Sequence, residues 1–379
     1  MNRTTFFALA AFILMSVQAH SQQIYFPPAG EWETRKASEF NLDLQEAVDF
    51  AMANEYSGSR DLRQAILKGF EREPYHEILG PTKRRGGPAG MILKNGYLVA
   101  EWGDTKRVDM TFSVTKSFLS TTALIARDKN LITDFDDQVV NYVWDDTFEG
   151  DHNEKITWEH LLQQNSDWSG QLWGGFDWAD RPPQDQTIED WRSRELHKPG
   201  TYFKYNDVRV NVLAYSLLNV FRKPLPRVLK DEIMDPIEAS QSWRWFGYEN
   251  SWTTIDGFKM QSVSGGGHSG GGMFINTQDM ARFGLLFMNS GTWKNQNLIP
   301  SNLIEEAIRS SEPNPAYGYM WWLNAGDREM SNINKDIFYA AGFGGNFIVV
   351  DRKNQMVIVT RWLEPSKLED FLNLIYKNL

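Results

Sequence analysis

The chain has 379 residues, of which 41% are hydrophobic and 13% aromatic, so it can bury an ample core in one large domain or two interleaved ones. Its formal net charge of -10 would repel a phosphate backbone or an anionic membrane, which argues against nucleic acid as a partner. The absence of cysteine excludes disulfides and thiolate zinc sites.

The first twenty residues have the pattern of an export signal. Arg3 supplies a short basic start, an apolar run follows over residues 6–17, and small residues stand where a signal peptidase cuts. The run is too short to span a bilayer comfortably, and no later stretch reaches that length. We therefore expect residues 1–20 to be a signal peptide, the protein to be periplasmic or secreted, and the chain to have no membrane span.

Two strands are predicted at residues 89–93 and 97–102, because apolar runs flank Asn95-Gly96, a dipeptide typical of tight hairpins. A helical pattern follows from Ser113 to about Ala126. From about 130 to 260 we expect short helices mixed with irregular loops. Two of these helices are predicted at residues 158–164 and 208–221.

Strand patterns return in the last quarter of the chain, before an amphipathic helix over residues 368–376. The predicted strands lie at 317–323, 338–341, 347–350 and 356–362. We expect an α+β or α/β fold in which an antiparallel sheet, flanked by helices, unites the two chain ends. Residues 21–379 would form one catalytic unit. Its α/β subdomain is expected over about 21–112 and 285–379, and an inserted, mainly helical subdomain over about 113–284, with the active cleft between them.

The most informative motif is Ser113-x-x-Lys116 at the predicted start of a helix. Residues i and i+3 share a helix face, so the amine of Lys116 can take the proton of the Ser113 hydroxyl. We expect burial and the helix macrodipole to favour the neutral amine. A serine that caps a helix and a solvated lysine would give the same motif. Other motifs in the chain are therefore needed to choose between the catalytic and the structural interpretation.

Two further segments supply partners for this pair. Tyr205 stands just ahead of a helix whose N-cap is Asn206 or Asp207, and its phenol could exchange protons with Ser113 and Lys116. A strand ends in glycines at residues 340–345, which lets a substrate approach the backbone edge. The backbone N–H groups of Phe343 and Ser113 could then form an oxyanion hole.

Together these motifs resemble the β-lactamase-related serine hydrolases, a family with class C β-lactamases, D-alanyl-D-alanine peptidases, esterases and 6-aminohexanoate-dimer hydrolases. The resemblance covers about residues 85–362 and includes similar blocks at 156–162, 270–284 and 317–321. It implies the β-lactamase-like, or transpeptidase-like, fold. It also implies that Ser113 is the nucleophile and that Lys116 and Tyr205 are its proton-transfer partners.

Departures from the family pattern bear on the substrate. Asp207 stands where the family often has the asparagine of Tyr-x-Asn, and it replaces a donor with a carboxylate that only accepts hydrogen bonds. Ala340 and Ala341 stand where β-lactamases carry Lys-Thr of Lys-Thr-Gly, so the cation for a β-lactam carboxylate is missing. We expect anionic substrates to bind poorly, and the chain to be nearest to the 6-aminohexanoate-dimer hydrolase and esterase branch.

Substrate contacts are expected from Asp207, Ala341, Gly342 and His268. Asp207 could equally be only a helix cap, and His268 a hydrogen-bonded structural histidine. Ser269 lies in Gly-x-Ser-x-Gly, but no histidine follows it, so an α/β-hydrolase elbow is rejected. His152 and His160 lack a further ligand at metal-site spacing, and neither a metal nor a cofactor is implied.

The sequence thus predicts a serine hydrolase of carboxylesterase or amidase type that cleaves a small ester or amide through an acyl-enzyme on Ser113. One alternative is a D-alanyl peptidase or weak β-lactamase. Another is a non-catalytic protein of the same fold that binds a cell-wall fragment or sugar. The oligomeric state cannot be read from the chain.

Overall fold

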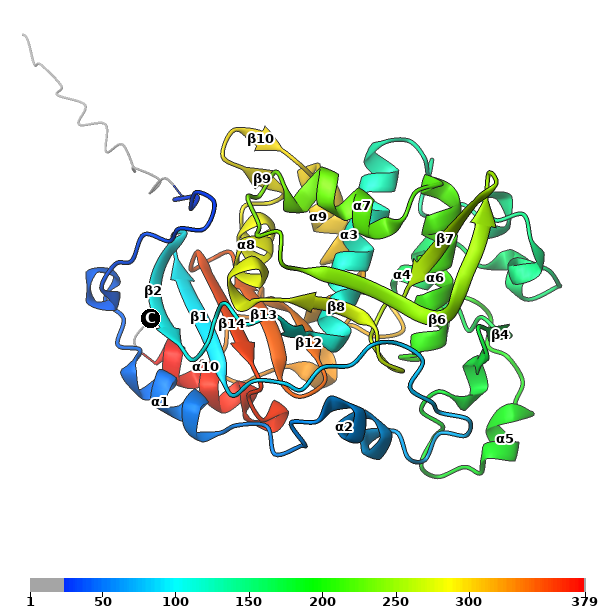
Figure 1. Ribbon diagram of the computed structural model, residues 1–379, viewed down its shortest axis with the longest axis horizontal. Coiled ribbons are helices and arrows are strands. Elements are labelled where there is room, and N and C mark those ends of the chain that lie inside the picture. Colours follow the sequence, from blue (N-terminus) through cyan, green and yellow to red (C-terminus); the bar gives the residue numbers. More distant parts are fainter. Residues whose placement is uncertain (1–23, 378–379) are drawn as a thin grey trace, which may run out of the picture.

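The computed structural model describes residues 24–377 (Figure 1). The expected signal peptide lies outside the described residues, so the signal and the export remain predictions. Across residues 24–377, every helix is too short or too polar to cross a bilayer.

A six-stranded antiparallel sheet unites residues from both ends of the chain, as the sequence predicts. Its spatial order is β11-β12-β13-β14-β1-β2. The bounds are β1 Ala89–Lys94, β2 Tyr97–Trp102, β11 Trp322–Leu323, β12 Phe338–Gly342, β13 Asn346–Asp351 and β14 Met356–Arg361. Asn95 and Gly96 have φ of 53° and 85°, so the β1–β2 turn needs the positive φ that Asn-Gly tolerates. Of the strand expected over 317–323, only β11 is extended, so that prediction is mostly wrong.

Helices cover both faces of this sheet. α8 (Thr277–Met288) packs on β1, β13 and β14. α1 (Gln45–Ala53) packs beside α10 (Leu368–Tyr376), and Figure 1 shows the two together at the opposite side of the sheet. The observed bounds of α10 match the predicted helix. The subdomain boundary expected at 284/285 falls inside α8, and that division of the chain stays a prediction.

The inserted part is built around α3 (Thr115–Asp128), which is buried from Thr115 to Ala126 and packs on α6 and α7. Buried hydroxyls are tolerated inside α3 because Ser120, Thr121 and Thr122 donate hydrogen bonds to carbonyls one turn back. The remaining helices are α2 Leu62–Gly69, α4 Trp158–Leu162, α5 Ile188–Arg192, α6 Asp207–Phe221, α7 Leu225–Leu229 and α9 Ser301–Ala307.

A second, four-stranded sheet, which was not predicted, crosses the inserted part. Its order is β3-β8-β6-β7, with β3 Asp109–Met110, β6 Arg244–Ile255, β7 Phe258–Val263 and β8 Gly272–Ile275. The expectation of helices and loops alone up to residue 260 was therefore wrong. Asp256-Gly257, with φ of 52° and 82°, forms the β6–β7 turn and is the hairpin signal that could have revealed it. Two small hairpins pair β4 Gln171–Leu172 with β5 Gly175–Phe176, and β9 Thr292–Trp293 with β10 Gln296–Asn297.

Candidate active site

Ser113 lies in a short 3-10 turn, Phe112–Val114, that leads from β3 into α3. Phe112 has φ of 49°, a left-handed conformation that costs a bulky residue about 1–3 kcal/mol. Its ring packs against Phe343 and Trp362, at centroid distances of 5.1 and 6.4 Å. Tertiary packing therefore holds this strained turn, and the turn fixes Ser113 at the entrance to the helix.

The structure brings Lys116 to Ser113, as the spacing of three residues predicts. Lys116 Nζ donates a hydrogen bond of 2.8 Å to Ser113 Oγ. The lysine side chain is only 1% exposed, because the first turn of α3 lies inside the protein. A buried cation of this kind needs a partner charge.

Asp207 is that partner, with Oδ1 2.6 Å from Lys116 Nζ. Burial acts to lower the pKa of Lys116, but the attraction of the Asp207 carboxylate, with a smaller contribution from Tyr205, outweighs it and the pKa of Lys116 is raised. Burial also acts to raise the pKa of Asp207, whereas Lys116 and Arg181 hold it well below its ordinary value. A neutral amine was expected from burial and the helix macrodipole, but the Asp207 carboxylate at 2.6 Å favours the ammonium form of Lys116.

A second cation binds the other carboxylate oxygen of Asp207. Arg181 NH1 lies 2.7 Å from Asp207 Oδ2 and 2.5 Å from Asp180 Oδ1. Asp180 also accepts a hydrogen bond from the backbone N–H of Asp207. With both oxygens engaged by protein cations, Asp207 as a substrate contact stays a prediction. Asp180 and Arg181 were not predicted as site residues, because they lie in an irregular loop and carry no periodic or motif signal.

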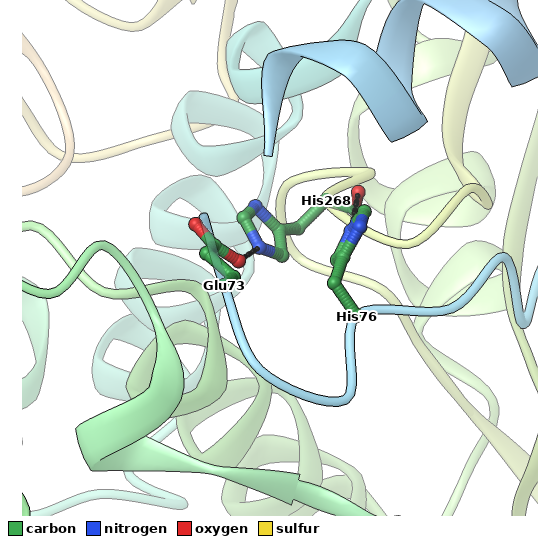
Figure 2. A group of neighbouring side chains, drawn as sticks. All are labelled: Glu73, His76 and His268. Carbon is green, nitrogen blue, oxygen red and sulfur yellow. Dashed lines mark hydrogen bonds and ion pairs between the residues drawn. The ribbon is translucent and has the colours of Figure 1, made fainter. Parts of the chain in front are cut away.

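His268 continues this network toward the N-terminal part of the chain (Figure 2). Its Nε2 lies 2.6 Å from Glu73 Oε2, and its Nδ1 lies 3.2 Å from Arg181 NH2. Because a guanidinium only donates, Nδ1 accepts from Arg181 and the Nε2–H group donates to Glu73. His76 stands beside them, with Nε2 3.2 Å from the carbonyl oxygen of His268.

Two groups here have the ligand types of a metal site, but hydrogen bonds explain both. Glu73 and His268 touch directly at 2.6 Å, whereas atoms that share a zinc ion with bonds of about 2 Å stand farther apart. In the group of Asp180, Asp207 and His268, the guanidinium of Arg181 already contacts all three. That no metal is needed stays a prediction, and this geometry agrees with it.

Tyr205 precedes α6, whose N-cap is Asn206, because the Asn206 side chain accepts a hydrogen bond from the backbone N–H of Arg209. The tyrosine ring centroid is 4.7 Å from Lys116 Nζ and 5.3 Å from the guanidinium carbon of Arg181. Both cations therefore lie close to the tyrosine ring, which places Tyr205 next to the lysine of the Ser113–Lys116 pair.

The end of β12 approaches the Ser113 turn so closely that only glycine fits there. A Cβ on Gly342 would lie 2.2 Å from the Thr111 carbonyl oxygen and 3.3 Å from Ser113 N. This contact places Phe343, which follows Gly342, next to the serine. The oxyanion hole of Ser113 and Phe343 N–H groups fits this arrangement, and it remains a prediction.

One cleft of about 390 Å³ contains Ser113, Tyr205 and three of the four expected substrate contacts, Ala341, Gly342 and His268. Asp207 instead lines a second cavity of about 70 Å³, which shares His268 with the cleft. The cleft walls are largely aromatic, formed by Tyr56, Phe70, Phe112, Trp322, Tyr339, Phe343 and Phe347. Arg181 and Arg328 also line it, whereas no Asp or Glu does so among the described residues. The expectation that anions bind poorly stays a prediction, and the two guanidinium groups of the lining count against it.

Comparison with known proteins agrees with this geometry. Residues 82–362 match the family described as Beta-lactamase. A comparison with curated proteins gives no significant match. Similar solved structures include a candidate 6-aminohexanoate-dimer hydrolase from Bacillus anthracis, with 17% identity, coverage of 93% of this chain and 88% of the other, and a TM-score of 0.58.

Two more structures are similar over most of both chains. One is a family VIII carboxylesterase, with 16% identity, coverage of 78% of this chain and 93% of the other, and a TM-score of 0.57. The other is a penicillin-binding protein homologue from Caulobacter crescentus, with 15% identity, coverage of 85% and 99%, and a TM-score of 0.57. At these identities the likeness shows the fold, which is the β-lactamase/transpeptidase-like fold expected from the sequence. The match over residues 82–362 shows that the chain belongs to the β-lactamase family.

Proposed function

We propose that this protein is a serine hydrolase that cleaves an ester or amide bond through an acyl-enzyme on Ser113. The observation that carries the proposal is the 2.8 Å hydrogen bond from the buried Lys116 Nζ to Ser113 Oγ, at a hydroxyl that lines an apolar cleft. Among its structural neighbours are an esterase, a candidate amide hydrolase and a penicillin-binding protein homologue.

In the proposed acylation step, Ser113 Oγ attacks the carbonyl carbon and the Tyr205 hydroxyl relays the proton: its oxygen takes the proton of Ser113 while its own O–H proton moves to the leaving atom. The ammonium of Lys116 stabilises the negative charge that develops on Oγ, because it already donates a hydrogen bond to that atom. The N–H groups of Ser113 and Phe343 stabilise the carbonyl oxygen as it becomes negative. The leaving group departs with the proton from Tyr205, and water then hydrolyses the acyl-enzyme and restores Ser113.

A purely binding role in a cell-wall or sugar complex fits these residues less well. Burying Lys116 and Asp207 costs several kcal/mol of desolvation for each ion before the pair repays it. A protein that only holds a ligand gains nothing from placing that pair beside a serine hydroxyl. The peptidase and β-lactamase activities remain alternatives within the same chemistry.

The test is hydrolysis of p-nitrophenyl butyrate by wild type and two serine variants. We expect Ser113→Ala to lower kcat/KM by about a thousandfold or more, since removing a nucleophile leaves only binding and oxyanion stabilisation. Ser269→Ala is the matched control, because Ser269 is the serine of the Gly-x-Ser-x-Gly sequence and lies outside the cleft lining. Loss of hydrolysis in Ser269→Ala with retention in Ser113→Ala would overturn the proposal.

A further inference from the structure

We propose that the cleft selects substrates with an apolar acyl group and a negatively charged leaving group, which Arg328 recognises from its position on Trp322. This inference rests on the proposed function of Ser113 and Tyr205. It concerns the substrate class, which the family match leaves open.

Among the cations at the cleft, Arg328 is the one that has no carboxylate partner within residues 24–377. Lys116 and Arg181 are cations near the serine, but both pair with Asp207, and Arg181 pairs with Asp180 as well. Arg328 is exposed at the cleft and forms no ion pair with any carboxylate of residues 24–377. An anionic group of a ligand would therefore gain a cation that no described carboxylate already neutralises.

Stacking orders the Arg328 guanidinium in advance. Its central carbon lies 4.4 Å from the centroid of the Trp322 ring. Trp322 is itself held edge-on by Tyr317, at a centroid distance of 4.7 Å. A cation fixed over an aromatic face loses less conformational entropy when it binds an anion than a freely rotating side chain does.

The stacking of Trp322 on Tyr205 identifies the side of the cleft on which the leaving group departs. Trp322 stacks on Tyr205, with ring centroids 5.8 Å apart and planes inclined by 19°. In the proposed mechanism Tyr205 gives its proton to the leaving atom, so that atom departs on the Tyr205 side. Substituents of the leaving group then extend along Trp322 toward Arg328.

An aromatic cluster near the expected oxyanion hole suits an apolar acyl group. The ring of Phe343 contacts the rings of Phe112, Tyr56 and Phe70 at centroid distances of 5.1, 5.5 and 6.0 Å. These four side chains line the cleft and carry no charge. An acyl chain that enters there removes apolar surface from water, which favours binding.

The test compares two butyrate esters that differ in charge only on the leaving group. One is the butyrate ester of 4-hydroxybenzoate, which is anionic, and the other is the butyrate ester of methyl 4-hydroxybenzoate, which is neutral. The measured quantity is the ratio of kcat/KM for the anionic ester to that for the neutral ester. We expect Arg328→Gln to lower this ratio by about tenfold or more, chiefly through KM of the anionic ester. Arg328→Lys, which keeps the charge without the planar stack, should give an intermediate ratio.

Lys335→Gln is the matched control, because it removes one positive charge from the same loop outside the cleft lining. Lys335 is 74% exposed and pairs with Glu329 at 2.9 Å. We expect its ratio to equal that of wild type. An unchanged ratio in Arg328→Gln, or an equal fall in both variants, would overturn the proposal. Failure of the proposed function itself looks different, because wild type would then hydrolyse neither ester through Ser113.

Discussion

At Asp207 a single carboxylate contacts both cations of the catalytic region. Its two oxygens lie 2.6 Å from Lys116 Nζ and 2.7 Å from Arg181 NH1. The family pattern often has an uncharged asparagine at this position, which would leave Lys116 without an anion and Arg181 with Asp180 alone. The carboxylate therefore decides the protonation state of the lysine beside Ser113, and this consequence of one residue can be measured.

Replacing Asp207 by the family residue, Asp207→Asn, should move the pH profile of kcat/KM to lower pH. Because the pKa of Lys116 is raised on folding, the ion pair stabilises the folded protein fully below the pKa of lysine in the unfolded chain, and this stabilisation is lost as pH rises through the folded pKa. Because the pKa of Asp207 is lowered on folding, the stabilisation is fully present above the pKa of aspartate in the unfolded chain. The pair is thus intact from about pH 4 to about pH 10.

In Asp207→Asn, burial and the charge of Arg181 still lower the pKa of Lys116, whereas the carboxylate that raised it most strongly is gone. We therefore expect the alkaline inflection to appear at lower pH than in wild type. The measurement is kcat/KM for a neutral ester between about pH 6 and pH 10.5. Superimposable profiles of the two proteins would contradict the role assigned to Asp207.

Among the helices, the position of α6 depends on a buried ion network at its first turn. Arg209 NH2 lies 2.7 Å from Asp167 Oδ1 and 3.1 Å from Asp177 Oδ2. Burial raises the pKa of Asp177, although Arg209 acts to lower it. These ion pairs connect the first turn of α6, which begins just after Tyr205, to the segment that contains Asp167 and Asp177.

Arg209→Met should lower the free energy of unfolding by about 3–5 kcal/mol, because it leaves Asp177 buried without its cation. Urea denaturation gives this value directly. Arg227→Met is the control, since Arg227 is 65% exposed and pairs with Asp231 one turn away. That pair should contribute at most about 0.5 kcal/mol. Equal losses in the two variants would show that the network does not anchor α6.

A feature of this structure could be predicted from the sequence when the residues that determine it lie close together along the chain. The β1–β2 hairpin, α10 and the Ser113–Lys116 contact follow from dipeptides and periodicity within a few residues. Helices and loops were expected where β6 and β7 form, because the Trp- and Gly-rich composition masked the alternating pattern. Arg181 and Glu73 reach the site from separate loops, and only tertiary structure sets such contacts.

Over the whole molecule, residues 24–81 precede the part that matches the family and yet help to build the site. Tyr56 and Phe70 line the cleft, and Glu73 hydrogen-bonds His268. On α2, Ile66 is fully buried in a cluster that includes Phe112 and Trp362. The N-terminal segment and the Ser113 turn therefore share one core.

Ile66→Ala should lower the free energy of unfolding by about 2–5 kcal/mol, with a single transition, because the segment and the sheet unfold together. Leu67→Ala, at the neighbouring position that is 40% exposed, should cost less than about 1 kcal/mol. Tryptophan fluorescence and circular dichroism in urea report both. An early separate transition in Ile66→Ala would mean that residues 24–81 form an independent layer.

The central claim is that Ser113 is the nucleophile, and intact-mass spectrometry after reaction with a fluorophosphonate tests it most directly. A serine activated by Lys116 forms a stable phosphonyl adduct, whereas ordinary serines do not react. We predict one adduct on wild type, one on Ser269→Ala and none on Ser113→Ala. An adduct that persists in Ser113→Ala and disappears in Ser269→Ala would contradict the account.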